Sequence, residues 1–332
     1  MDAINYTAVI RTLGKAGEKY QLLLDSLCNQ TIRPNRILVY IAEGYPLPKE
    51  TCGKEEYIYV KKGMVAQRAL PYDEVDTEYI LSLDDDLYLP LDFVEKMFEA
   101  LRSNTADVVS PDIYPNASRG LIAELMMTLS GRMRARRGDK TYGYKVMSTS
   151  GFSYNKSPEP KAYLSQTNAG ACFLCRKSDF LKIRFQDELW LDRIGYAIGD
   201  DQIMFYKMHL YGLKQLTLFG TGIEHLDAGF NLGNKDKELK LIEGDYFFRK
   251  VFWHRFLQTP ERIVLKRLWN KICINYFYAF GFFISALKGK NETLEAKRRG
   301  LANANSFLKS EEYISLPRIE KRYEYCTYCI CF

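Results

Sequence analysis

Three consecutive aspartates, Asp84, Asp85 and Asp86, follow an apolar, β-prone run at residues 79–83. Adjacent carboxylates repel one another unless a cation joins them, and the hard cations magnesium and manganese take oxygen ligands of this kind and also bind phosphates. One alternative is an acidic turn that caps the next helix, but a cap needs only one aspartate. Another is an Asp-x-Asp phosphatase loop, which expects a small β-branched residue where Tyr88 stands. The triplet therefore favours a metal site.

A second pair of adjacent acids, Asp200 and Asp201, follows Gly199 at the start of the helical pattern of residues 199–214. A carboxylate placed beside a reacting hydroxyl group can act as a general base, and two neighbouring acids hinder each other's ionisation. The same pair also suits a helix N-terminus, where the dipole favours aspartate. The residues alone leave both interpretations open.

The elements that must position these acids alternate between strands and helices. Apolar β-prone runs predict strands, and apolar residues at helical spacing predict helices. The predicted strands are 6–12, 36–42, 57–60, 79–84 and 107–111, and the predicted helices are 15–31, the first part of 63–75, and 91–103. This order indicates an α/β domain with a mostly parallel sheet. Ligands bind beyond the carboxyl ends of such strands, and the aspartate triplet lies at one of them.

The composition is that of a folded globular protein, with 332 residues, 47% of them hydrophobic and 27% charged. The net charge is +6, and the basic runs at 132–140 and 266–271 favour a local anionic partner over nucleic acid.

No basic region precedes an apolar one at the amino terminus, so no secretory signal is expected. The cysteines are expected to be free thiols, because a zinc site would need Cys172 and Cys175 to meet the C-terminal cysteine cluster.

Four segments in order resemble the family-two glycosyltransferases, the inverting family of GT-A fold that uses nucleotide-diphosphate sugars. They read "TAVIRTLGKAGEKYQLLLDSLCNQTIRPNRILVYIAEG", "GMVAQRALPYDEVDTEYILSLDDD", "QTNAGACFLCRKSDF" and "GDDQIMFYKMHLYGLK". The resemblance covers residues 1–230 and implies a Rossmann-like GT-A catalytic domain with a mixed, mostly parallel sheet flanked by helices. Residues 1–111 would form its nucleotide-sugar half and residues 112–230 its acceptor half.

The resemblance also implies roles for the acids of the triplet. Asp84 and Asp85 would approach the nucleotide. Asp86, together with His225, would hold the Mn²⁺ or Mg²⁺ ion that bridges the two phosphates of the donor. The plainer interpretation of His225, an ordinary hydrogen-bonded histidine, stays open.

Further roles follow from the same resemblance. Asp201 would be the catalytic base, preceded by Asp200 where the family more often has a glutamate. Thr12 and Glu43 would line the base pocket, although the family usually has an acidic pair where this chain has Glu43 alone. Arg68 would lie near the phosphates, or would be a charge on a helix face. No P-loop and no Rossmann fingerprint is present, which argues against ATP and NAD.

Residues 231–332 are expected to form a helical C-terminal extension. The apolar stretch 272–287 is shorter than the roughly 20 residues of a spanning helix. Peripheral membrane contact through 260–290 and packing of this segment on the catalytic domain are both open. The segment "YFFRK" resembles one in family members that make bacterial cell-surface polysaccharides, whose acceptors are commonly lipid-diphosphate-linked sugars. Within the acceptor half, 119–135 is predicted to be helical and 138–162 to be a mobile loop over the active site.

These observations predict an inverting, metal-dependent glycosyltransferase of the hexosyltransferase type (EC 2.4). It would move a sugar from a nucleotide-diphosphate donor, with a UDP-sugar expected, to a glycan or lipid-linked saccharide, and it would have no nucleic-acid partner. It is expected in the cytoplasm, peripheral on the inner face of the cell membrane. A sugar-phosphate nucleotidyltransferase and a non-catalytic glycan-binding or scaffold protein on the same fold are the alternatives. The sugar, the acceptor and the linkage cannot be read from the sequence.

Overall fold

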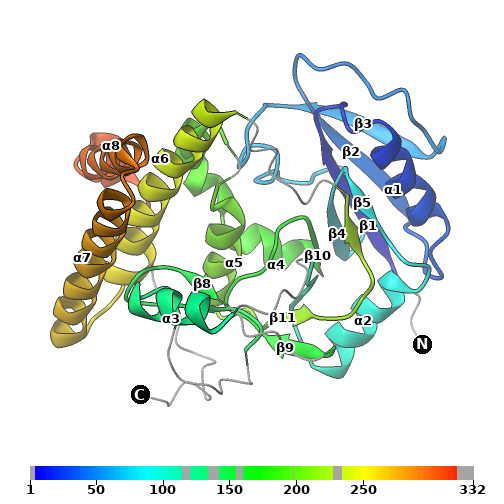
Figure 1. The fold of residues 1–332 in the computed structure, drawn as a ribbon. Helices are drawn as coiled ribbons and strands as arrows, with labels where there is room; N and C mark the ends of the chain where they lie inside the picture. The colour runs from blue at the N-terminus through cyan, green and yellow to red at the C-terminus, as the bar shows by residue number, and fades with distance from the viewer. Residues whose placement is uncertain are drawn as a thin grey trace.

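A central eight-stranded sheet organises the N-terminal part of the protein (Figure 1). The computed structural model describes residues 4–113, 120–133, 142–154, 160–196, 198–226 and 234–319. The sheet consists of β1 (Tyr6–Thr12), β2 (Arg36–Ala42), β3 (Glu55–Val60), β4 (Tyr79–Asp84), β6 (Val108–Pro111), β9 (Ala162–Leu164), β10 (Cys172–Arg176) and β11 (Gln215–Leu218). Its order is β3-β2-β1-β4-β10-β6-β11-β9, and all strands are parallel except β10 and β9.

Helices cover both faces of this sheet, which is why its central strands are continuous apolar runs. The helices α1 (Glu18–Cys28) and α2 (Phe93–Ser103) bury their apolar sides on one face, with Leu24 and Met97 fully enclosed. The helices α4 (Lys177–Lys182) and α5 (Asp200–Leu210), with the 3₁₀ segment η1 (Phe185–Ile194), cover the other face. The carboxyl ends of β1, β2 and β4 therefore open at one edge between the two layers.

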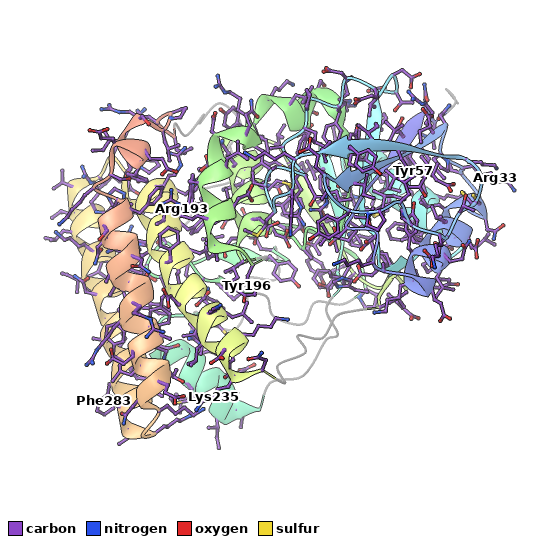
Figure 2. All side chains as sticks on the ribbon, turned by 90° about the horizontal axis from the view of Figure 1, so that it is seen from above. Arg33, Tyr57, Arg193, Tyr196, Lys235 and Phe283 are labelled. Carbon is purple, nitrogen blue, oxygen red and sulfur yellow. The ribbon has the colours of Figure 1, made fainter. Side chains whose placement is uncertain are left out.

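The C-terminal part is a helical bundle beside the second layer (Figure 1). It consists of α6 (Lys235–Phe252), the π-helical turn η2 (Trp253–Gln258), α7 (Val264–Leu287), α8 (Asn291–Phe307) and α9 (Glu311–Ser315). Figure 2 shows Lys235 and Phe283 at this end of the molecule and Tyr57 and Arg33 at the opposite end. Among the described residues, no helix is both long enough and apolar enough to cross a membrane.

The bundle shares one hydrophobic core with the sheet-covering helices. The Phe252 ring of α6 meets the Tyr206 ring of α5 edge-on, with centroids 5.4 Å apart. A buried ionic cluster joins the same parts: the Glu188 carboxylate accepts from Arg255 Nε at 2.9 Å and lies 2.9 Å from Lys207 Nζ. Removing one partner would leave a buried charge uncompensated, so this cluster holds the bundle on the sheet-covering helices. Within the segment 260–290, one side of α7 is buried against the protein through Ile274, Phe277 and Tyr278.

The fold expectation of a mixed, mostly parallel sheet flanked by helices, with a C-terminal helical extension, is confirmed and is that of a GT-A fold. The predicted helix within 63–75 is wrong, because these residues form turns. Tyr72, directly after Pro71, has a φ of 53°, which a right-handed helix cannot accommodate. The helix predicted at 119–135 is the shorter α3 (Leu121–Leu129). Much of the predicted mobile loop, 138–141 and 155–159, lies outside the described residues.

Candidate active site

The aspartate triplet lies where β4 leaves the sheet, and a short strand pair brings a histidine to it. The strand β12 (Glu224–His225) pairs with β5 (Leu87–Tyr88), so that His225 is opposite Leu87. The Leu226 N–H donates to the Asp86 carbonyl at 2.9 Å, which fixes the register. His225 Nε2 lies 3.1 Å from Asp86 Oδ1. Two residues about 140 positions apart in the sequence are thereby placed side by side.

Asp84 joins Asp86 and His225 in one group whose ligand atoms all lie within 4.8 Å of one another. Two carboxylates and an imidazole form a donor set that a divalent cation can use. Arg11 is opposite Asp84 in the β1–β4 register and forms an ion pair with Asp84 Oδ1. The second carboxylate oxygen of Asp84 is left for another partner. These three side chains thus fit a divalent cation. One of them, Asp84, was predicted from the sequence to approach the nucleotide instead.

Cysteine gives no comparable group in the described part of the chain. Cys172 and Cys175 are buried free thiols on β10. The C-terminal cysteine cluster lies outside the described residues.

Asp85 is turned to the other side of the strand end and meets Thr12. The Thr12 hydroxyl donates to Asp85 Oδ2, and the Gly14 N–H in turn donates to Thr12 Oγ1 at 2.8 Å. Burial raises the pKa of Asp85 to about 6, the Thr12 hydrogen bond opposes the rise, and the charges of Asp86 and Asp84 add to it. Thr12 and Asp85, both predicted to bind the nucleotide, are therefore neighbours at the carboxyl ends of β1 and β4.

The second acidic pair stands at the N-terminus of α5 and shares one arginine. Arg68 Nη1 lies 2.7 Å from Asp200 Oδ2 and also pairs with Asp201 Oδ1. The Gly170 N–H donates to Asp201 Oδ2 at 2.9 Å. The Asp200 side chain is 6% exposed, whereas that of Asp201 is 32% exposed. Only the second acid of the pair is thus accessible to a reactant.

The two acids titrate in opposite directions. Burial raises the pKa of Asp200 to about 7, against the attraction of Arg68, and the charge of Asp201 contributes to the rise. Burial opposes ionisation of Asp201 as well, but Arg68 and the Gly170 N–H outweigh it and lower the pKa of that carboxyl. Asp201 is therefore the ionised member of the pair at neutral pH.

Gly170 connects the two clusters of acids. Arg11, the partner of Asp84, reaches the Gly170 carbonyl at 3.5 Å, and Arg68, the partner of Asp201, reaches it at 3.4 Å. A Cβ atom at position 170 would lie 2.0 Å from Asp201 Oδ1, so only glycine permits this approach. The group that could hold a cation and the acid pair thus lie on two sides of a single backbone segment.

A carboxylate from η1 positions the turn that carries Arg68. Asp192 accepts hydrogen bonds from the N–H groups of Val65 and Ala66 at 2.7 and 3.2 Å. Gly63 leaves room for it, since a Cβ there would lie 2.3 Å from Asp192 Oδ2. Gln67, in the same turn, donates to the Thr12 carbonyl at 3.2 Å. One turn therefore connects both halves of the site.

Sequence reasoning missed Arg11, Gly170 and Asp192. A charged Arg11 inside the apolar strand 6–12 was the one signal in the sequence, because a buried charge needs a partner. Glu43 follows β2 with an exposed side chain, and its backbone N–H donates to the Val60 carbonyl at 2.8 Å. Glu43 takes no part in the described contacts that join the other predicted residues to one another, so its role stays a prediction. Arg68 contacts carboxylates here, and its phosphate role also stays a prediction.

Comparison with known families addresses the same segment. Residues 57–182 match the family model described as glycosyl transferase family 2. No curated protein matches the chain. The matched segment contains Arg68, the aspartate triplet and Gly170, whereas Asp201 and His225 lie beyond its end. The match supports a glycosyltransferase that uses a nucleotide-sugar donor in general, in agreement with the resemblance seen in the sequence.

Proposed function

We propose that this protein is an inverting, metal-dependent glycosyltransferase that transfers a sugar from a nucleotide-diphosphate donor, a UDP-sugar, to a glycan or lipid-linked saccharide. The observation that carries the proposal is the arrangement of two acidic clusters on either side of Gly170. One cluster, Asp84 and Asp86 with His225, can hold a cation. The other presents a single accessible carboxylate, that of Asp201.

The metal-binding group is proposed to receive the donor. A divalent cation held there neutralises the charge that develops on the departing nucleotide diphosphate. Thr12 and Asp85 lie next to the group at the carboxyl ends of β1 and β4, where we place the ribose and the base, together with Glu43. Arg11 holds one oxygen of Asp84 and so orients the carboxylate that faces the cation.

Asp201 is proposed to be the catalytic base, with Asp200 as its buried neighbour. Arg68 and the Gly170 N–H keep Asp201 ionised, which is the form that accepts a proton. The carboxylate would take the proton of an acceptor hydroxyl as its oxygen bonds to the anomeric carbon and the bond to the donor phosphate breaks. Such a single displacement inverts the configuration. Asp200, whose pKa of about 7 leaves it about half protonated at pH 7 and largely protonated below it, limits the negative charge beside the base.

The division of the chain follows from these roles. We place the catalytic domain at residues 1–230, with the nucleotide-sugar half at 1–111 and the acceptor half at 112–230, and the extension at 231–332. The segment 260–290 is proposed to contact a membrane peripherally, on the cytoplasmic face, as in enzymes that build bacterial cell-surface polysaccharides. Mn²⁺ or Mg²⁺ is the proposed cofactor.

A turnover panel tests the proposal. The protein is incubated with UDP-, GDP- and CMP-sugars, each with Mn²⁺, with Mg²⁺ and with a chelator, and release of the free nucleotide is measured with and without saccharide acceptors. Metal-dependent release from one donor class, stimulated by an acceptor, is expected. Release of pyrophosphate from a sugar phosphate and a nucleoside triphosphate would instead indicate a nucleotidyltransferase, and no turnover with any donor would favour a binding protein.

A further inference from the structure

The helix α3 is apolar, yet it buries none of its residues in the protein. Its sequence is LIAELMMTL, and Leu121 and Ile122 are 80% and 79% exposed. Apart from Glu124 and Thr128 its residues are apolar, and a helix of such composition is normally enclosed by a core or by a membrane. Exposed apolar surface of this kind marks an interaction site.

The helix α7 has a second apolar face opposite its packed one. Ile274, Phe277 and Tyr278 are buried on the side toward the bundle. At 100° per residue, Trp269, Ile272 and Phe283 fall on the other side of the helix, and all are exposed. Figure 2 shows Phe283 at the outer edge of the bundle.

These two apolar surfaces are contiguous. Tyr276, on the exposed face of α7, donates through its hydroxyl to the Leu129 carbonyl at the end of α3, at 2.8 Å. The Arg132 guanidinium, just beyond α3, lies 5.8 Å from the centre of the Phe277 ring. Figure 1 shows α3 next to α7. Their combined exposed residues, named here the α3–α7 surface, are Leu121, Ile122, Leu125, Trp269, Ile272 and Phe283.

Basic residues border the α3–α7 surface. Arg267 and Lys271 are exposed in the first turns of α7, Lys288 and Lys290 follow its end, and α7 contains no acidic residue. Lys266 Nζ pairs with Glu261 at 2.9 Å, and Glu124 is the one acidic residue of α3. Trp269 and Tyr276 are of the types that favour the level of lipid headgroups. Two copies joined through this surface would bring like charges together, whereas an anionic bilayer complements them.

We infer that the α3–α7 surface docks on an anionic lipid bilayer and that α3 inserts into the bilayer together with α7. The inference deepens the proposed function, on which it rests for the identity of the acceptor. Ser150, whose hydroxyl donates to the Gly131 carbonyl at 2.8 Å, links the end of α3 to Gly151. Gln202, the neighbour of the proposed base, donates to the Gly151 carbonyl at 2.7 Å. The docked helix is thus connected to the acceptor side of the site, which makes a lipid-anchored saccharide the acceptor class.

Vesicle flotation tests the docking surface without donor or acceptor. The full chain is mixed with phosphatidylcholine vesicles that contain phosphatidylglycerol, or with phosphatidylcholine vesicles alone. The α3 variant carries Leu121→Glu, Ile122→Glu and Leu125→Glu. Its control carries Leu22→Glu and Leu47→Glu, which are exposed in α1 and after β2. A charge variant carries Arg267→Gln and Lys271→Gln, with Lys49→Gln and Lys54→Gln as its control.

Binding is expected to anionic vesicles only, with a loss of at least about tenfold in the α3 variant and none in its control. The charge variant should lose about fivefold in affinity for each basic residue neutralised. Unchanged flotation of the α3 variant would overturn the inference, as would a dimer in light scattering that the α3 variant converts to monomer. Binding of UDP with Mn²⁺, measured without vesicles, reports separately on the proposed function: vesicle binding without nucleotide binding would refute only that function and the acceptor assignment.

Discussion

The two acidic clusters of this protein differ in how their charge is balanced. At the end of β4 there are three carboxylates and one arginine: Arg11 pairs with Asp84, His225 lies beside Asp86, and Asp85 meets the Thr12 hydroxyl. At the start of α5, two carboxylates share Arg68, and burial raises the pKa of Asp200 to about 7, so that the second cluster is close to neutral. An excess of negative charge at only one of two adjacent clusters indicates where a cation is needed and where it is not.

The two clusters also differ in how accessible their carboxylates are. Asp201 shares Arg68 with Asp200 and still presents an accessible, ionised carboxylate, because Arg68 and the Gly170 N–H contact it without covering it. Asp86 is more enclosed, with 14% of its side chain exposed, and is oriented toward His225. One cluster thus suits the binding of a cation, and the other suits the transfer of a proton.

The largest effect is expected when the cation-binding cluster loses a ligand. Asp86→Asn should lower kcat/KM about 10³-fold, because the leaving group loses its electrostatic stabilisation. Nucleotide release at saturating Mn²⁺ measures this. Asp92→Asn, an exposed acid whose carboxylate pairs with Lys96, is the control and should leave the rate unchanged. Full activity of Asp86→Asn would show that the excess charge has no catalytic role.

The next largest effect is expected at the accessible acid of the other cluster. Asp201→Asn should lower kcat about 10²- to 10⁴-fold, because an amide cannot take the acceptor proton, while the affinity for nucleotide and metal stays the same. Steady-state kinetics measure kcat, and calorimetry on the same preparation measures the affinity for nucleotide and metal. A loss of nucleotide binding with an intact kcat would assign Asp201 to the donor site and erase the distinction between the clusters.

A smaller effect is expected from crowding the backbone segment between the clusters. Gly170→Ala places a Cβ against the Asp201 carboxylate and should lower kcat about tenfold or more through misplacement of the base. Gly120→Ala is the matched control, since nothing lies within 4 Å of a Cβ there. If both variants had wild-type kcat and wild-type melting temperature, the close approach at Gly170 would not matter.

The smallest effect concerns the pH dependence of stability. The folded pKa of Asp200 is raised from 3.8 to about 7, so the native state binds more protons than the unfolded chain between about pH 4 and about pH 7. Its contribution to the free energy of unfolding therefore falls as the pH rises through that window. Asp200→Asn should remove this slope and be relatively more stable at pH 8 than at pH 5 in thermal melts. Parallel wild-type and variant curves would contradict the charge balance assigned to this cluster.

Much of the scaffold could be predicted from the sequence, because its strands are apolar runs bounded by polar residues. The strands 36–42 and 79–84 were predicted residue for residue. The turn 63–69 was not, because its form depends on Asp192, 127 positions after Val65. The resemblance placed Asp86 with His225, and the structure brings the two together.

The contacts that organise the site could not be predicted in this way. Arg11 and Asp84 are 73 positions apart, and only the strand order makes them neighbours. Gly170 acts through the space that its missing side chain leaves, which no residue pattern reveals. The exposure of α3 could not be predicted either, because its apolar sequence alone would indicate a buried helix.

Calorimetric titration of UDP into the wild-type protein and into Asp86→Asn, each with and without Mn²⁺, tests the central claim most directly. The account predicts that UDP binds the wild type only when Mn²⁺ is present, that Asp86→Asn abolishes this binding, and that Asp201→Asn retains it. Metal-independent binding of UDP, or binding that Asp86→Asn leaves intact, would contradict the assignment of the cation to the end of β4.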